Sequence, residues 1–211
     1  MQPPFTPEEF FRVFHDYNVA AWPVQIVLIL AALFALCCVI WNFEGKDRGA
    51  SMSLAILWFW SGAVYQLYWL SELTAVAELF AVLWIAGAFL FYIFGVGDHQ
   101  LRFMRVSGVR GIGGWSLVAY SLVGYPLLNL MLGHSIVDSP SFGLPCPTTL
   151  FTIGLLAFLD PPYPRLVFAA PVIWSLIGLQ AALFLGVYAD LALLPAAVFG
   201  IWLAVYNKRD K

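Results

Sequence analysis

Long apolar runs separated by short polar connections dominate this sequence. An α-helix needs about 20 apolar residues to cross a bilayer core of about 30 Å, and most of the runs approach that length. They predict seven membrane-spanning helices, over residues 20–41, 51–70, 74–94, 115–132, 147–159, 166–188 and 191–206. The fifth is short, because about 12 residues at about 1.5 Å each reach only about 18 Å. The pattern therefore predicts an all-α integral membrane protein with a short fifth helix.

A different pattern comes before the first predicted span. The run Thr-Pro-Glu-Glu at 6–9 has the spacing of a capping box, with proline at the first helical position, so we expect a helix to begin there. Apolar side chains then recur at helical spacing opposite the charged ones, at Phe10, Val13, Phe14 and Tyr17. This pattern predicts an amphipathic helix over residues 1–19 that lies on the membrane surface. A single transmembrane helical domain over 20–206 follows it.

Basic residues fall in alternate connections between the predicted spans. They are Lys46, Arg48, Arg102, Arg105, Arg110, Arg165, Lys208, Arg209 and Lys211. Lysine and arginine in short loops collect on the cytoplasmic side of a membrane, so all of these connections are expected inside. The other connections hold Arg12 and most of the acidic residues. The predicted amino terminus is therefore outside and the carboxyl terminus inside, with 207–211 as a basic cytoplasmic tail.

Composition leads to the same class of protein. Of the 211 residues, 62% are hydrophobic, 17% are aromatic and 10% are charged, which is far from a soluble globular domain. The lipid bilayer is thus the first expected partner. A formal net charge of -2 gives no indication of nucleic-acid binding.

The segment 133–152 interrupts the apolar pattern with a thiol, an imidazole and a carboxylate. Prolines flank Cys146 on both sides, and a residue before proline is pushed out of the α region. We therefore expect the fifth helix to begin at Pro147, with Cys146 as its N-cap at the positive end of the helix dipole. A half-helix below a re-entrant strand over 139–147 is a recurring form of solute site in membrane proteins. The alternative is local thinning of the bilayer, without a site.

Two kinds of chemistry fit the polar residues of this segment. Cys146, His134 and Asp138 together suit a soft or borderline metal ion such as Cu(I), Zn(II) or Hg(II). The same three also suit a thiol-dependent enzyme, with Cys146 as nucleophile, His134 as base and Asp138 orienting the imidazole. A third interpretation gives them no chemistry, with Cys146 as a structural cap and His134 at the end of the fourth span. A metal ion is the one cofactor that this pattern suggests.

Further polar residues near the predicted outer surface define a candidate substrate pathway. Glu72 and Glu78 lie at the outer ends of the second and third spans, where carboxylates attract cations. Thr148 and Thr149 place hydroxyl groups on the first turn of the fifth helix. The alternative for the two glutamates is a solvated loop beside an interfacial tryptophan.

Several runs of the sequence resemble a known family. They are FTPEEFFRVFHDYN, WFWSGAVYQLYWL, GHSIVDSP, FGLPCPTTLFTIGLL and PVIWSLIGLQAALFLGVYADLALL. Together they are similar to an uncharacterised family of small bacterial multipass membrane proteins, a domain of unknown function, over nearly the whole chain. The resemblance implies a bacterial inner-membrane protein and draws attention to the Pro-Cys-Pro-Thr-Thr segment, but it implies no substrate, cofactor or catalytic residue. Gln66 stands where this family often has histidine.

Three functions from different classes follow from these patterns. The first is a channel or transporter for a small solute or metal ion, with its site near the outer end of the fifth helix. The second is a structural or accessory subunit of a homo-oligomer or membrane complex, because Gly178, Ala182 and Gly186 form a small-residue helix face. The third is the thiol-dependent membrane enzyme. Solute uptake, a fixed partner and a covalent adduct on Cys146 distinguish the three.

Overall fold

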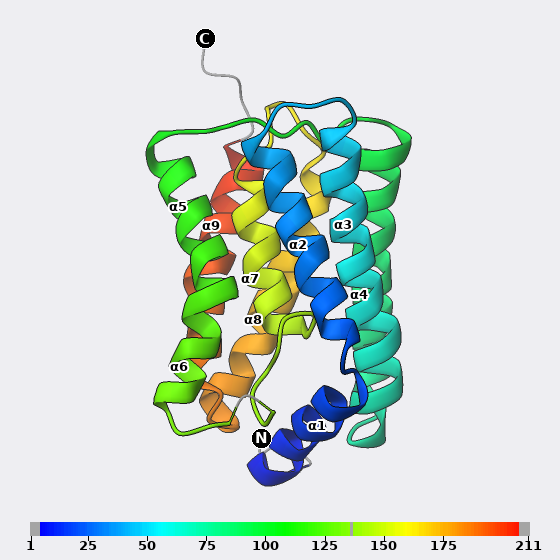
Figure 1. Cartoon of the computed structure of the whole chain (residues 1–211), viewed down its shortest axis with the longest axis vertical. Helices are drawn as coiled ribbons and strands as arrows, with labels where there is room; N and C mark the ends of the chain where they lie inside the picture. Colours follow the sequence, from blue (N-terminus) through cyan, green and yellow to red (C-terminus); the bar gives the residue numbers. More distant parts are fainter. Residues whose placement is uncertain (1–4, 136, 207–211) are drawn as a thin grey trace.

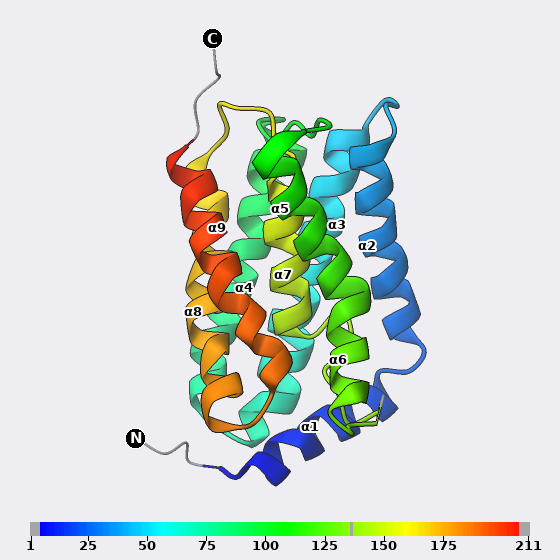
Figure 2. The ribbon, with the colours of Figure 1, turned by 90° about the vertical axis from the view of Figure 1, so that its left-hand side faces the viewer.

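The computed structural model describes residues 5–135 and 137–206, and the regular secondary structure within them is helical. Most of the helices run side by side along the long axis, and α1 lies across one end (Figures 1 and 2). The elements are α1 (Pro7–Ala20), α2 (Val24–Ile40), α3 (Lys46–Trp60), η1 (Ser61–Trp69), η2 (Leu70–Glu72), α4 (Val76–Phe91), η3 (Tyr92–Gly97), α5 (Gly108–Ala119), η4 (Tyr120–Gly124), α6 (Tyr125–Met131), α7 (Pro145–Leu156), η5 (Arg165–Phe168), α8 (Ala169–Phe184), η6 (Tyr188–Ala192) and α9 (Leu193–Val205). Of the η elements, η1, η3 and η4 are π-helical turns that continue an α-helix, and the others are 3₁₀ turns.

Among the described residues, four helical stretches are long and apolar enough to cross a membrane. They are Val76–Gly97, Gly108–Met131, Arg165–Phe184 and Tyr188–Val205. A fifth is added if α1 and α2, which meet at an angle of 89°, form one broken span. Each of the seven predicted ranges holds a helix, so the prediction of an all-helical protein is confirmed. The number of membrane crossings and their orientation stay predictions.

The outward faces of these helices are apolar. Leu79 and Val82 on α4 and Val198 on α9 are each more than half exposed. Soluble monomers rarely present apolar patches of more than a few hundred Å², whereas a surface in contact with lipid needs them. The exposed side chains are therefore those expected of a protein in a bilayer.

The amino-terminal helix α1 begins as the sequence predicts. The Thr6 hydroxyl accepts a hydrogen bond from the Glu9 amide at 3.2 Å, and the Glu9 carboxylate accepts one from the Thr6 amide at 2.8 Å. This reciprocal pair is a complete capping box. Phe14 and Tyr17 are buried, whereas Glu8 and Glu9 are exposed, so α1 is amphipathic across the end of the bundle.

A buried asparagine ties α1 to the loop that precedes α7. The Asn18 amide nitrogen donates to the carbonyl oxygens of Val137 at 2.6 Å and Ser139 at 2.8 Å. Its side-chain oxygen accepts hydrogen bonds from Gln25 at 2.8 Å and Ser141 at 2.7 Å. A segment more than 100 residues away in the sequence is thereby fixed against the junction of α1 and α2.

The short helix α7 lies in the centre of the bundle, as Figures 1 and 2 show, and most of its side chains are fully buried. It begins at Pro145, so the predicted start at Pro147 is wrong by two residues. Leu144 is the N-cap, with extended backbone, and Cys146 lies inside the first turn. Both prolines fit there because the first turn of a helix has no internal acceptors for its N–H groups.

The middle of the bundle is packed closely against α7. Trp58 stacks on Trp84 with ring centroids 4.0 Å apart, and its indole N–H donates to Thr152 at 2.9 Å. On another side of α7, Gly114 of α5 meets Gly154 so closely that a Cβ on either would lie 2.9 Å from the other's carbonyl oxygen. Small residues of this kind allow helix backbones in membranes to approach each other.

The carboxyl end of α7 is held by side chains and backbone from other elements. Arg110 donates through Nη2 to the carbonyl oxygens of Ala157 at 2.8 Å and Leu159 at 2.7 Å. The Met104 amide donates to the Phe158 carbonyl at 2.8 Å. These bonds use carbonyl groups that have no partner within the helix itself.

Candidate functional site

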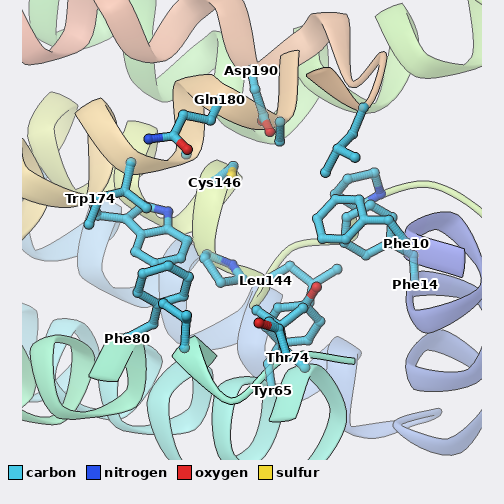
Figure 3. Close-up of a pocket in the computed structure, with 18 of the residues that line it drawn as sticks. Phe10, Phe14, Tyr65, Thr74, Phe80, Leu144, Cys146, Trp174, Gln180 and Asp190 are labelled. Carbon is cyan, nitrogen blue, oxygen red and sulfur yellow. The ribbon is translucent and has the colours of Figure 1, made fainter. Parts of the chain in front are cut away.

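A cavity of about 470 Å³ lies at the amino end of α7 (Figure 3). Its walls come from α1, η1, η2, α4, α7, α8 and η6, which span most of the sequence. The apolar part of the wall includes Phe10, Phe14, Phe80, Leu144, Ile177 and Leu185. Small-molecule sites are usually concave spaces of about 300–1,000 Å³ with mostly apolar walls and a few polar groups. The cavity has this form.

Asp190 is the buried acidic group of the cavity wall, and it is 1% exposed. The Tyr125 hydroxyl donates to its Oδ1 at 2.5 Å, and the Cys146 thiol is its second hydrogen-bonding neighbour. The described residues place no lysine, arginine or histidine in an ion pair with Asp190. Acidic side chains within membrane-spanning stretches are rare and usually mark a functional site.

Two buried hydrogen-bond donors lie on the same wall, the Tyr65 hydroxyl and the indole N–H of Trp174. The Tyr65 hydroxyl has no partner among the described residues, whereas the Trp174 N–H lies beside the sulfur of Cys146, a weak acceptor. Tyr65 is 2% exposed and Trp174 is 4% exposed, so bulk solvent does not reach them. Burying a polar group without a partner is unfavourable, and most native structures contain only a few such groups. Both donors lie around the open space in Figure 3.

Two glycines of the α8–η6 region shape this wall. Gly186 has φ 77°, a left-handed conformation that favours glycine, and it turns the chain from α8 into η6. Gly178 lets α7 and α8 approach, because a Cβ there would lie 3.2 Å from Trp174 Nε1 and 3.3 Å from Cys146 Sγ. Gly178 and Ala182 are buried, so this part of the predicted small-residue face packs within the chain itself.

The three predicted metal ligands have different surroundings. His134 stacks on Phe11 with ring centroids 4.5 Å apart, and Asp138 accepts a hydrogen bond from His15 Nδ1 at 2.8 Å, if that nitrogen is protonated. Cys146 is instead on the cavity wall beside Asp190. Within the described part of the chain, no three His, Cys, Asp or Glu side chains form a group that could hold a metal ion. The geometry thus gives neither the predicted metal centre nor the predicted pairing of Cys146 with His134.

The pair of Asp138 and His15 belongs to the surface rather than to the cavity. Both side chains are about half exposed, at 45% and 51%. Hydrogen bonds from Ser135 first, and then from His15, lower the pKa of the Asp138 carboxyl below its ordinary value of 3.8. The pair fastens the loop before α7 to α1.

The predicted pathway residues fall into two groups. Glu72 and Glu78 are exposed. Thr148 and Thr149 are fully buried in α7, and their hydroxyl groups have no partner among the described residues, although neither threonine lines the cavity. Gln66 is also buried with both polar atoms of its side chain unpartnered in the described structure. Of all the predicted site residues, Cys146 is the one on the cavity wall.

Comparison with known proteins decides the family. Residues 7–211 match the family described as "Family of unknown function (DUF6064)". The chain belongs to this family. No curated protein and no solved structure matches the chain. The expectation of an uncharacterised family is therefore confirmed for this DUF6064 protein, and the family brings no activity to it.

Three wall residues of the DUF6064 cavity, Asp190, Tyr65 and Trp174, and the Asp190 partner Tyr125 are absent from the sequence-based site prediction. A signal existed for one of them. Asp190 stands between two long apolar runs with only a few residues to connect them, so its carboxyl has little room to reach water. The aromatic residues carried no such signal, because interfacial tyrosine and tryptophan are common in every membrane protein.

Proposed function

We propose that this DUF6064 protein is a multipass protein of the bacterial inner membrane that transports a small solute. Its proposed topology has seven spans, with the amino terminus outside and the carboxyl terminus inside. The solute site is the cavity at the outer end of the fifth span, which is α7. The observation that supports this most directly is the cavity itself, with a buried carboxyl at Asp190 and an unpartnered hydroxyl at Tyr65 in the described structure.

The placement of the cavity supports transport over simple anchoring. It lies at one end of a half-length helix, and discontinuous or short helices that end in a cavity are how many transporters hold their substrate. The amphipathic helix α1 supplies Phe10 and Phe14 to the wall, so a small displacement of α1 would change access to the cavity. The thiol-dependent enzyme has less support, because the neighbour of Cys146 is a carboxyl rather than an imidazole base.

The topology is tested with single cysteines in a protein in which Cys37, Cys38 and Cys146 are replaced by alanine. Cysteine at Glu72, which is exposed near the cavity end, should react with an impermeant maleimide on intact spheroplasts. Cysteine at exposed Ser107, at the other end, should react only after lysis. The reverse result would invert the proposed orientation.

Transport is tested with purified protein in sealed vesicles. Uptake of radiolabelled L-phenylalanine, benzoylcholine and Zn(II), one probe for each charge class, is compared with uptake into protein-free vesicles. At least one probe should enter faster with the protein. Ala181→Trp places a large side chain in the cavity and should abolish that uptake. Leu183→Trp, on the exposed side of the same helix, should leave the uptake unchanged. Uptake equal to that of empty vesicles for all three probes, or equal uptake by both tryptophan variants, would contradict transport through this cavity.

A further inference from the structure

The buried carboxyl of the cavity has no counter-charge among the described residues. Asp190 accepts a hydrogen bond from Tyr125 and contacts the thiol of Cys146, and both of these partners are neutral groups. A carboxylate in a medium of low dielectric either takes up a proton or is stabilised by a counter-charge beside it. A cationic ligand in the cavity would supply this counter-charge.

The walls around Asp190 favour an organic cation over a metal ion. Metal ions of the first transition row need several N, O or S ligands, and the described residues offer no group of three that could bind one. Calcium and magnesium ions need six or more oxygen ligands, some of which are water molecules. The phenylalanine and leucine side chains of the walls provide no such ligands. A substituted ammonium group is less strongly hydrated and is attracted to the faces of aromatic rings.

Aromatic side chains surround the same space from three sides. Phe10 and Phe14 come from α1, Tyr65 from η1, and Phe80 and Trp174 from α4 and α8 (Figure 3). Trp174 meets Phe80 edge to face, with centroids 5.3 Å apart. Such an arrangement suits a ligand with a flat or bulky apolar body next to its charged group.

The exposed part of the cavity wall is largely apolar as well. Val76 on α4 and Phe184 on α8 line the cavity and are 51% and 55% exposed, and Gln180 on α8 is the exposed polar side chain beside them. A hydrated inorganic ion would have to shed its water there, whereas an amphiphilic molecule can enter with its apolar part in contact with Val76 and Phe184. The volume of about 470 Å³ is also that of a small organic molecule rather than of a bare ion.

The buried donors of the wall define a second polar feature of the ligand. The Tyr65 hydroxyl is buried and has no acceptor among the described residues, whereas the Trp174 indole N–H lies beside the Cys146 sulfur, a weak acceptor. A ligand oxygen with free lone pairs would satisfy the Tyr65 hydroxyl and would be a better acceptor for Trp174 than the sulfur. The combination of a carboxyl, a free donor and largely apolar walls therefore selects for a molecule with three matching parts.

We propose that the cavity binds an organic cation, an ammonium group that lies against Asp190, joined to an apolar or aromatic body and to an oxygen that accepts a hydrogen bond from Tyr65 or Trp174. This inference rests on the proposed solute site and names the class of solute. It requires binding only, so it is independent of whether the solute crosses the membrane.

Binding is tested by titration of the detergent-purified full chain with benzoylcholine, which has a permanent positive charge, a phenyl ring and an ester carbonyl. Its neutral carbon isostere, 3,3-dimethylbutyl benzoate, is the matched ligand control. Benzoylcholine should bind at least tenfold more tightly than the isostere. Asp190→Asn should remove this tenfold preference, whereas Asp138→Asn, at the exposed pair, should keep it. Equal affinity for the two ligands, or a preference that survives Asp190→Asn, would overturn the proposal.

A second variant keeps the test decisive if Asp190→Asn does not fold. Tyr65→Phe removes one hydroxyl group that makes no hydrogen bond in the described structure and leaves the ring in place. This variant should weaken the binding of benzoylcholine several-fold and leave the binding of benzyltrimethylammonium, which lacks the ester, unchanged. Equal effects on the affinities of both ligands, or no effect on either, would contradict a hydrogen bond from Tyr65 to the ligand oxygen.

Two outcomes separate this inference from the proposed transport. Binding of benzoylcholine without its uptake into vesicles would contradict transport alone. Uptake of phenylalanine without binding of benzoylcholine would contradict this inference alone.

Discussion

The two ends of α7 are completed in different ways. At the carboxyl end, Arg110 donates through Nη2 to the carbonyl oxygens of Ala157 and Leu159, and the Met104 amide donates to the Phe158 carbonyl. At the amino end, the Tyr65 hydroxyl borders a cavity and has no partner among the described residues. The backbone carbonyls at the carboxyl end are thus satisfied by donors of the chain, whereas a buried donor beside the amino end has no acceptor in the described structure.

The two ends of α7 therefore have different roles, because the carboxyl end stabilises the fold and the amino end borders the candidate site. Natural sequences satisfy buried polar groups almost everywhere, and exceptions concentrate at functional sites. Contacts with α5 fix the carboxyl end of α7, and the loop before α7, which is bonded to Asn18 of α1, fixes the amino end. We expect substitutions at the carboxyl end to affect stability and substitutions at the cavity to affect binding.

The largest expected loss of stability is at the carboxyl end. Arg110→Gln leaves two carbonyl oxygens without their charged donor, and each buried group without a partner costs about 1–3 kcal/mol. We expect a loss of about 3 kcal/mol in the free energy of unfolding, measured by denaturation in mild detergent. Arg102→Gln, at an exposed position of the same connection, should cost far less. Equal losses for the two variants would show that Arg110 does not hold this end.

The next effect is at the contact of α5 with α7. A Cβ at Gly114 would lie 2.9 Å from the Ala157 Cβ and 2.9 Å from the Gly154 carbonyl oxygen, which is backbone and has little freedom to move. Gly114→Ala should therefore lower the free energy of unfolding by about 2 kcal/mol. Gly97→Ala is the control, since its nearest neighbour would be 3.9 Å away. Comparable thermal unfolding of the two variants would contradict a close helix contact.

A matched pair of tyrosines compares the two ends directly. The Tyr163 hydroxyl, near the carboxyl end, donates to the Leu203 carbonyl at 2.9 Å, so Tyr163→Phe should cost about 1 kcal/mol. The Tyr65 hydroxyl has no partner in the described structure, so Tyr65→Phe should change the stability of the ligand-free protein by less than about 0.5 kcal/mol. A larger loss for Tyr65→Phe would mean that the cavity donor has a structural partner.

The smallest effect concerns the loop that fastens α1 beside the amino end. The pKa of Asp138 is lowered in the folded protein, so the ionised carboxyl stabilises the fold above pH 3.8, and this contribution is lost as the pH falls through the lowered pKa. At pH 7, Asp138→Asn should reduce stability by less than about 1 kcal/mol, since the pair is half exposed. The difference between the two proteins should shrink at pH 3. A difference that grows on acidification would mean that the pKa is raised.

The elements of the fold could be read from the sequence, because each helix carries its own apolar pattern. All seven predicted ranges hold a helix, and the capping box at Thr6 is in place. The start of α7 could not be read to the residue, since a proline at either 145 or 147 fits a first turn. The π-helical turns of η1, η3 and η4 were also not predictable, because they depend on contacts between helices.

The cavity was predictable only through Cys146. That residue was conspicuous because it stands between two prolines. His134 and Asp138 are near it in sequence, but the loop directs them to Phe11 and His15 on α1. The wall of the cavity needs faces of seven elements at once, and no local pattern states which faces meet. A short-range signal therefore located the place without identifying the residues that surround Cys146 in the structure.

The π-helical element η1 has a consequence for how the cavity can vary among related chains. η1 covers nine residues and includes Tyr65, and a π turn holds about one residue more than an α turn. The π turns take up this extra residue, so a return to regular α geometry at the same length would rotate everything after it by about 100°, which is the rotation per residue of an α-helix. The chain leading to Thr74 would then present a different face to the cavity. We expect related chains with α rather than π geometry at 61–69, and no change in length, to differ in ligand preference, through the phase of the helix rather than through the identity of any side chain.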